Sequence, residues 1–350
     1  GPGLGLRRGC PVSAHLRLAI VGCGEIGRWM ALFGRLNRRI RLVACCDRRR
    51  PVADACAARF RIPQVYDDYG TLLARERPDA VYLAVPHDLH FEMVAAAVEA
   101  GIHVLVEKPV ARTLVEGREI VDRARAADVR VGVNYQYRYD SGCYALAQAA
   151  RQGDLGELYY GRCNVPWYRE ADYFAQGSWR GELARSGGGT LITQGSHALD
   201  LLLWALDSPP RAATGLTARP RFPQVEVETV ALGTVELESG ALIQISSSMV
   251  ARPEQAVTLE LYGERGTALY SNQPWPHARF RGLRVSRMRP PVWGVHALQR
   301  CLEAFRAWIV EDRPYLIPAA EALPVLAAVE ALYSSARSGE VGLVSLNEGA

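Results

Sequence analysis

The sequence predicts an α/β chain with an N-terminal doubly wound parallel sheet and a C-terminal α+β domain built on a large open antiparallel sheet. Through about residue 135, short apolar runs alternate with helical patterns across short connections, as in parallel sheets with crossover helices. Further on, several segments alternate apolar and polar residues, as half-buried antiparallel strands do. A length of 350 residues also suits two domains.

Each strand predicted in the first part is a short apolar run, and each helix is a longer segment between two such runs. The expected order is strand 16–22, helix 26–37, strand 40–47, helix 51–60, strand 64–66, helix 69–76, strand 80–85, helix 90–100, strand 103–106, helix 114–127 and strand 129–135. We therefore expect a first domain over residues 16–135, preceded by a flexible tail over residues 1–15.

The second part, residues 136–350, mixes helical patterns with alternating ones. Helices are expected at 141–152, 197–206, 295–310 and 319–335, and strands at 226–237, 241–249 and 258–262. Ser239-Gly240 lies where a hairpin turn would join the first two strands. Residues 211–224 contain prolines and show no clear period, so we expect a surface connection there.

Composition excludes several classes of function. The net charge is +4, and no block of like charge is longer than residues 48–50, so no nucleic-acid surface is expected. No apolar run reaches the roughly 18 residues of a membrane span, and no secretory signal is recognisable. None of the eight cysteines forms a C-x-x-C pair, so neither a metal site nor a disulfide framework is expected. Free thiols indicate a reducing compartment, the cytoplasm.

Residues 22–27 (GCGEIG) form a glycine-rich turn between the first predicted strand and the first predicted helix. Gly22 allows the tight turn, Gly24 allows close approach of a pyrophosphate, and Gly27 allows close packing of helix and strand. Asp47 ends the second strand, where an acid accepts hydrogen bonds from an adenosine ribose. A bound dinucleotide is expected to contact Gly22, Gly24, Glu25, Ile26, Gly27, Asp47 and Arg48.

The residues around Asp47 bear on cofactor choice. A carboxylate repels a 2′-phosphate and therefore favours NAD, whereas Arg48 and Arg49 would neutralise such a phosphate. The sequence predicts NAD as the preferred cofactor, with NADP as the alternative.

Lys108 is the only lysine in the chain, and every other Lys or Arg position is arginine. It lies in Glu107-Lys108-Pro109, at the carboxyl end of a predicted strand, where open α/β sheets bind ligands. Its compact ammonium differs from guanidinium because its proton can be tuned and transferred. Residues 187–200 (GGGTLITQGSHALD) then place a glycine run before a helix that carries His197.

These motifs together resemble the glucose–fructose oxidoreductase/inositol dehydrogenase (Gfo/Idh/MocA) family. The resemblance rests on residues 22–27, 107–109 and 187–200, and extends to residues 86–90 (PHDLH), 132–138 (GVNYQYR) and 333–339 (YSSARSG). In residues 86–90, His87 stands where the family carries asparagine. The match covers nearly all of residues 16–346.

The resemblance implies a Rossmann domain followed by a domain whose open sheet joins subunits, so we expect a homodimer or homotetramer. It implies that Lys108 and His197 are catalytic, and that Pro86, His90, Glu107 and Lys108 itself help to bind the cofactor. Many relatives carry aspartate four residues before the histidine, whereas this chain carries Thr193. A hydroxyl cannot collect a proton at neutral pH, so an aspartate-assisted relay is in doubt here.

A histidine with its ordinary pKa of about 6.5 suits proton transfer, and a lysine ammonium stabilises a developing alkoxide. Aromatic rings beside arginines at 167–169 and 178–181 suit a sugar that carries an anionic group. Residues expected to contact substrate are Tyr135, Arg138, Trp167, Arg169, Trp179, Arg180, Thr193, Gln194 and His197.

The predicted function is hydride transfer between NAD(P) and a hydroxyl-bearing carbon of a sugar, sugar nucleotide or cyclitol, with an acidic or nucleotide-linked sugar favoured. One alternative is a glycosidase that uses tightly held NAD transiently. A second is a cofactor-binding regulator without catalysis, which would have no need for Lys108 and His197.

Overall fold

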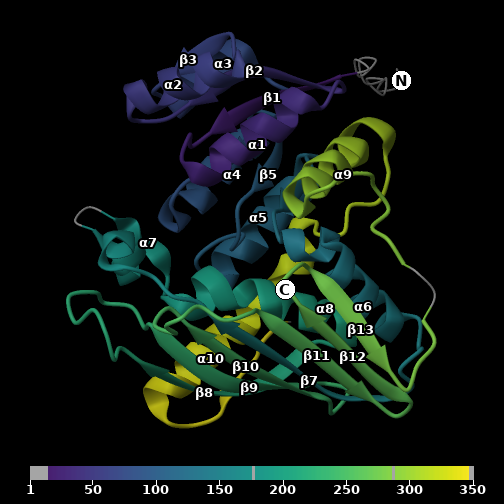
Figure 1. Ribbon diagram of the computed structural model, residues 1–350. Helices are drawn as coiled ribbons and strands as arrows, with labels where there is room; N and C mark the ends of the chain where they lie inside the picture. The colour runs from purple at the N-terminus through teal and green to yellow at the C-terminus, as the bar shows by residue number, and fades with distance from the viewer. Residues whose placement is uncertain (1–14, 176–177, 286–287, 347–350) are drawn as a thin grey trace, which may run out of the picture.

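The computed structural model describes residues 15–175, 178–285 and 288–346. The expected tail over residues 1–15 therefore lies almost wholly outside the described residues. The first part of the chain forms a six-stranded, fully parallel sheet in the order β3-β2-β1-β4-β5-β6 (Figure 1). Its strands are β1 Leu16–Val21, β2 Ile40–Cys46, β3 Gln64–Tyr66, β4 Ala80–Leu83, β5 His103–Val106 and β6 Val131–Val133.

Helices connect these strands and confirm the predicted doubly wound sheet. They are α1 Glu25–Leu36, α2 Arg50–Phe60, α3 Tyr69–Glu76, α4 His90–Glu99 and α5 Leu114–Ala126. The central strand β4 is completely buried, as expected for a strand covered by helices on both faces. The strands therefore end together at one edge of the sheet, the edge that carries the candidate site.

The second part forms an eight-stranded sheet in the order β13-β12-β11-β7-β10-β9-β8-β14. Every neighbouring pair is antiparallel except β7 and β10, so the sheet is mixed. Its strands are β7 Leu158–Pro166, β8 Pro210–Ala218, β9 Val230–Leu237, β10 Leu242–Ser248, β11 Thr258–Gly263, β12 Gly266–Ser271, β13 His277–Arg281 and β14 Gly342–Leu343. Gly240 turns between β9 and β10 with φ of 87°, as the predicted hairpin requires.

The prediction of a surface connection over residues 211–224 was wrong for its first half, because residues 210–218 form strand β8. Small residues hid this strand from the apolar pattern. A Cβ on Gly215 would lie 2.7 Å from the Leu332 carbonyl oxygen, and the Gly215 amide donates to Ser335 Oγ at 3.1 Å. The strand needs small side chains because helix α10 packs directly on its backbone. Strands β7, β12, β13 and β14 were also not predicted.

The remaining helices are α6 Ser141–Arg151, α7 Leu183–Ser186, α8 Ser196–Leu206, α9 Ala297–Glu311 and α10 Leu323–Ser338. Helices α6, α8 and α10 contact the inner face of the large sheet (Figure 1). Helix α9 returns to the first domain and packs against α1. Within the described ranges, none of the helices combines the length and the apolar character needed to cross a bilayer.

The outer face of the large sheet carries exposed apolar side chains. Tyr160, Leu216, Leu232 and Leu242 are between 41% and 73% exposed, on strands β7, β8, β9 and β10. In the register of the sheet, Tyr160 lies beside Leu242 and Leu216 lies beside Leu232, so this face carries two separate exposed apolar pairs.

Candidate active site

The glycine turn has the close contacts that its motif predicts. Gly22 has φ of 86°, and a Cβ there would lie 2.1 Å from the Ala84 carbonyl oxygen. A Cβ on Gly27 would lie 1.8 Å from the Gly22 carbonyl oxygen, so neither position accepts a side chain. Gly24, by contrast, faces open space and precedes the first turn of α1, which carries Glu25 and Ile26. Free N–H groups at this helix end suit a pyrophosphate.

Asp47 lies at the end of β2 and is held in place by the glycine turn. Its Oδ2 accepts a hydrogen bond from the Cys23 amide at 3.0 Å, and its Oδ1 accepts one from the Arg49 amide at 2.9 Å. The Arg49 guanidinium lies 3.6 Å from the same carboxylate, whereas Arg48 makes no ion pair within the described residues. The geometry fits a ribose hydroxyl, with Arg49 as the nearest cation.

Lys108 extends from the end of β5 to the second domain. Its Nζ donates a hydrogen bond to the Thr193 carbonyl oxygen, so the amine does not point into solvent. Burial lowers the pKa of Lys108 to about 8, Glu107 opposes this shift, and the Arg180 guanidinium adds to it. The amine is therefore close to half protonated slightly above neutral pH.

Glu107 is tied into a buried network instead of facing the cleft. Its Oε1 accepts hydrogen bonds from the Tyr82 hydroxyl and, at 2.6 Å, from Asn134 Nδ2. Burial raises the pKa of Glu107, while these two donors lower it. Glu107 therefore fixes the end of β5 and, through its charge, supports protonation of Lys108. The sequence predicted that Glu107 binds the cofactor, whereas the structure gives its carboxylate a positioning role in this network.

His197 is only 7% exposed and lies at the start of α8. Its ring meets the Tyr135 ring edge-on at 5.7 Å and lies 5.2 Å from the Tyr137 ring. Its Nδ1 is buried without a hydrogen-bond partner among the described residues. Burial and the Lys108 charge lower the pKa of His197 well below its ordinary value. The expectation of a histidine titrating near 6.5 is thus corrected: this imidazole is neutral at pH 7.

Thr193 takes part in the candidate site through its backbone carbonyl group and not through its hydroxyl group. Its Oγ1 donates to the Gly189 carbonyl oxygen at 2.6 Å, so it does not assist His197. Residues Leu191–Gly195 form a π-helix, a feature frequent at functional sites, and this segment presents the carbonyl that holds Lys108. Gln194 lies in the same segment and has a buried, unpartnered Nε2 within the described residues.

Glu228 supports this π-helix and was not predicted from the sequence. Its carboxylate accepts hydrogen bonds from the amides of Gly189 at 2.7 Å and Leu191 at 2.9 Å, and from the Tyr333 hydroxyl at 2.8 Å. The glycine run allows this approach, because a Cβ on Gly189 would lie 1.8 Å from the Glu228 carbonyl oxygen. The only sign of this role in the sequence was an acidic residue within a segment predicted to form a strand.

Arginine and aromatic side chains within residues 167–180 pack against one another. The Arg169 guanidinium lies 4.8 Å from the Trp167 ring centre and 5.6 Å from that of Tyr173. The Arg180 guanidinium lies 5.1 Å from the Tyr173 ring and 5.0 Å from the Trp179 ring. We call these five side chains the arginine–aromatic stack. The stack brings the segments 167–169 and 178–181 together around Tyr173.

The two arginines of the stack differ in their charge partners. Arg169 pairs with Glu254 at 3.3 Å. Arg180 has no acidic partner among residues 15–175, 178–285 and 288–346, and its charge acts on Lys108 and on His87. Within the described residues, Arg180 is therefore a cation without an acidic partner whose charge reaches the Lys108 amine.

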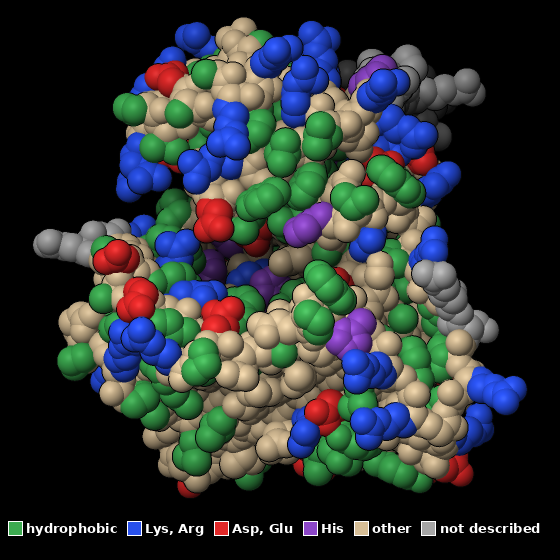
Figure 2. Space-filling model, viewed as in Figure 1, with side chains coloured by type: hydrophobic (Ala, Val, Ile, Leu, Met, Phe, Trp, Pro, Cys, Tyr) green, Lys and Arg blue, Asp and Glu red, His purple; other side chains and the backbone are tan. Residues whose placement is uncertain are grey.

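Residues 86–90 connect this wall to the first domain. The His87 ring lies 4.5 Å from the Trp179 ring, and its Nδ1 lies 2.8 Å from the Ser186 carbonyl oxygen. Asp88 pairs with Arg185 at 3.1 Å. Figure 2 shows a hollow between the two halves of the molecule, with histidine and charged side chains around it.

Two predicted contact residues are placed elsewhere. Arg138 is buried and donates to both oxygens of Asp200, at 2.8 and 2.9 Å, and to the Leu316 carbonyl oxygen, so it does not face a substrate. His90 is fully buried, and its ring nitrogens lie 2.7 Å from the Pro109 oxygen and 3.1 Å from the Val85 oxygen. It braces the loop that starts at Pro86, leaving no nitrogen for a cofactor.

Comparison with known proteins agrees with this geometry. Residues 16–135 match the model of an oxidoreductase family with an NAD-binding Rossmann fold, and residues 122–269 match the GFO/IDH/MocA C-terminal domain. This chain belongs to the GFO/IDH/MocA oxidoreductase family. Its first domain is accordingly an NAD-binding Rossmann domain and the protein an NAD(P)-dependent oxidoreductase, as the sequence predicted.

Among curated relatives, D-glucoside 3-dehydrogenase of Escherichia coli (strain K12) is 27% identical over 93% of this chain and 97% of that protein. D-apiose dehydrogenase of Paraburkholderia graminis is 29% identical over 92% of this chain and 88% of that protein. Among solved structures, the WlbA dehydrogenase from Bordetella pertussis, in complex with NADH and UDP-GlcNAcA, is 27% identical with a TM-score of 0.84, over 95% of this chain and all of that one.

Proposed function

We propose that this GFO/IDH/MocA oxidoreductase transfers a hydride between NAD and a hydroxyl-bearing carbon of a sugar that carries a carboxylate or phosphate. The observation that carries the proposal is a buried amine, Lys108, that feels the positive charge of Arg180, a guanidinium without an acidic partner among the described residues. The UDP-GlcNAcA in the WlbA structure is in keeping with an anionic sugar. We also propose that the boundary between the two domains lies near residue 135.

Bound NAD supplies the hydride acceptor or donor at this site. Lys108 holds one N–H on the Thr193 carbonyl oxygen, which fixes the position of the amine and leaves its other valences free to exchange a proton. During oxidation the neutral amine accepts the proton of the reacting hydroxyl, and during reduction the ammonium returns it. His197 is neutral, so it would orient a neighbouring sugar oxygen as a hydrogen-bond partner and would not carry the proton.

Arg180 recognises the anionic group of the substrate. A guanidinium binds a carboxylate or phosphate through charge-assisted, paired hydrogen bonds. The Tyr173 and Trp179 rings lie 5.1 and 5.0 Å from this guanidinium and limit the positions that its side chain can take. The anion also neutralises the positive charge that lowers the pKa of Lys108, which couples substrate binding to the protonation of the amine.

A panel of uronic acids, nucleotide-linked uronic acids, and their neutral counterparts tests the proposal through absorbance of the reduced cofactor. We expect turnover of anionic members, with Arg180→Gln raising KM for these members about 10- to 100-fold, equivalent to a lost charged hydrogen bond of about 1.5–3 kcal/mol. Arg221→Gln is the matched control, because Arg221 also stacks on rings and pairs with Glu170. Equal KM in wild type and Arg180→Gln rejects the assignment of Arg180.

The glycosidase alternative is separated by a chromogenic glycoside. Release of the chromophore without a net change in reduced cofactor would favour it over net oxidation. A non-catalytic regulator is not in keeping with the named dehydrogenases among the relatives.

We also propose a cytoplasmic homo-oligomer. The seven cysteines in the described part of the chain are all free and buried, which suits a reducing compartment. The face of the large sheet that carries these exposed apolar pairs would join two copies. Light scattering on wild type and Leu232→Asp tests this, since a charge in one of the pairs should shift the population to monomers.

A further inference from the structure

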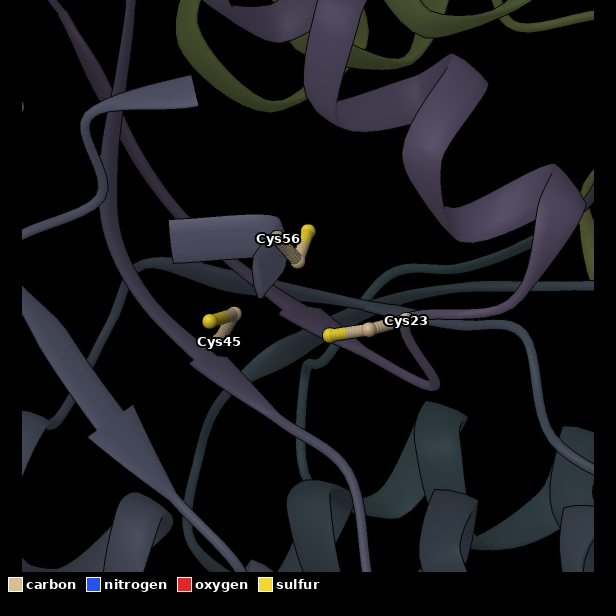
Figure 3. Close-up of side chains that lie close together, drawn as sticks. All are labelled: Cys23, Cys45 and Cys56. Atoms are coloured by element: carbon tan, nitrogen blue, oxygen red, sulfur yellow. The ribbon is translucent and has the colours of Figure 1, made fainter. Parts of the chain in front are cut away.

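Three cysteine side chains lie side by side beneath the glycine turn (Figure 3). Cys23 comes from the turn between β1 and α1, Cys45 from β2, and Cys56 from α2. Their Sγ atoms all lie within 4.8 Å of one another, and none of the three residues is more than 1% exposed. We call them the three-thiol cluster. Because they come from three separate elements, no spacing rule for metal sites could reveal them.

The surrounding backbone offers these thiols only long hydrogen bonds. Cys23 Sγ lies 3.7 Å from the Cys46 carbonyl oxygen, and Cys45 Sγ lies 3.5 Å from the Ala53 carbonyl oxygen. The three sulfurs therefore share one buried space in which the surrounding protein offers them few competing partners.

We propose that the three-thiol cluster binds a soft, thiophilic ion of the Cu(I) type and that this binding opposes cofactor binding. Thiolate sulfurs select Cu(I), zinc or iron–sulfur clusters. Structural zinc sites are closed by four ligands, and iron–sulfur clusters are held by four cysteines. Within the described residues, this group contains no fourth cysteine, histidine, aspartate or glutamate ligand. Three sulfurs in a buried space leave Cu(I) as the ion that fits.

The cluster is joined to the cofactor site through Cys23. This residue lies between Gly22 and Gly24, and its amide donates the hydrogen bond that orients Asp47. An ion that holds its sulfur therefore constrains the same turn and the same carboxylate that receive the cofactor. Coupling between two such sites is reciprocal: if the ion weakens NAD binding, NAD weakens binding of the ion.

Binding changes no oxidation state. Sulfur–copper bonds form, the S–H bonds of the thiols that ionise break, and their protons pass to solvent while the chelator that delivered Cu(I) is released. The +1 charge of the ion offsets one thiolate, which limits the cost of burying the complex.

Competition for Cu(I) between the reduced full-length protein and bicinchoninate, without oxygen, tests the site. We expect wild type to retain a single Cu(I), and Cys56→Ala and Cys45→Ala to lose most of it. Cys163→Ala is the matched control, because Cys163 is a buried free cysteine on β7 in the other domain. Circular dichroism and NADH binding report whether each variant is folded. Copper retention equal in wild type and in folded Cys56→Ala overturns the site.

The coupling is measured by NADH fluorescence titration with and without one equivalent of Cu(I). We expect copper to weaken NADH binding to wild type, to leave Cys56→Ala unaffected, and to enter wild type more slowly when NADH is saturating. NADH affinity that does not change with copper overturns the coupling. Neither measurement uses a sugar, so its result is independent of the proposed substrate.

Discussion

Raising the pH should switch on sugar oxidation through the buried amine of Lys108. With a pKa of about 8, about a tenth of this amine is neutral at pH 7, compared with about one part in 3,000 at the ordinary value of 10.5. Burial thus increases the population of the competent base about 300-fold. For oxidation, kcat/KM should rise with unit slope in log units below about pH 8 and level off above it. Reduction should show the opposite dependence, because it needs the ammonium.

The assay is initial-rate absorbance of the reduced cofactor between pH 6 and 10 on an accepted anionic sugar. The kcat profile should break at a higher pH than the kcat/KM profile, because the bound anion offsets the Arg180 charge that lowers the pKa of Lys108. Lys108→Arg should remove the break and most of the turnover while keeping NADH affinity. His197 adds no break in this range, because its pKa lies well below 6.5. A break near 6.5, or a flat profile, would refute the role given to Lys108.

Three further changes probe the frame of the site. Arg138→Ala leaves the Asp200 carboxylate buried without its partner and should lower the free energy of unfolding in urea by about 3–5 kcal/mol, whereas Arg211→Ala, at an exposed pair, should cost at most about 1 kcal/mol. Similar losses of unfolding free energy in the two variants would show that burial does not make the Arg138–Asp200 pair more important than an exposed pair. Glu228→Ala should lower kcat with NADH affinity unchanged, and Glu228→Gln should retain part of kcat because its amide oxygen still accepts one bond; a loss of NADH affinity instead would contradict this. Asp47→Ser should raise the apparent KM for NAD and lower that for NADP, and an unchanged ratio would remove Asp47 from cofactor selection.

The features that the sequence predicted well are those fixed by short stretches of chain. The turn at 22–27 could be recognised because Gly22 and Gly27 meet neighbouring backbone directly. The parallel sheet followed from apolar runs that are buried on both faces. Lys108 stood out because no other lysine exists in the chain.

The features that were missed depend on partners distant in sequence. Glu228 meets Gly189 across 39 positions, and Arg138 meets Asp200 across 62, so neither pairing leaves a local pattern. Strand β8 went unseen because its inward positions are small, to admit helix α10. The pKa of His197 could not be predicted, because it depends on a burial that only the packed second domain creates.

Residues 315–317, which lie between helices α9 and α10, complete the edge of the first sheet. The Val133 amide in edge strand β6 donates to the Ile317 carbonyl oxygen at 3.0 Å, and the Tyr315 hydroxyl donates to the Val133 carbonyl oxygen at 2.9 Å. Helix α9 covers α1 from the same side. A fragment cut after residue 135 would therefore expose an unpaired strand and an apolar helix face, both of which invite aggregation. A Rossmann domain transferred to another protein would therefore need residues 315–317 and helix α9 as well, because these cover its edge strand and helix α1.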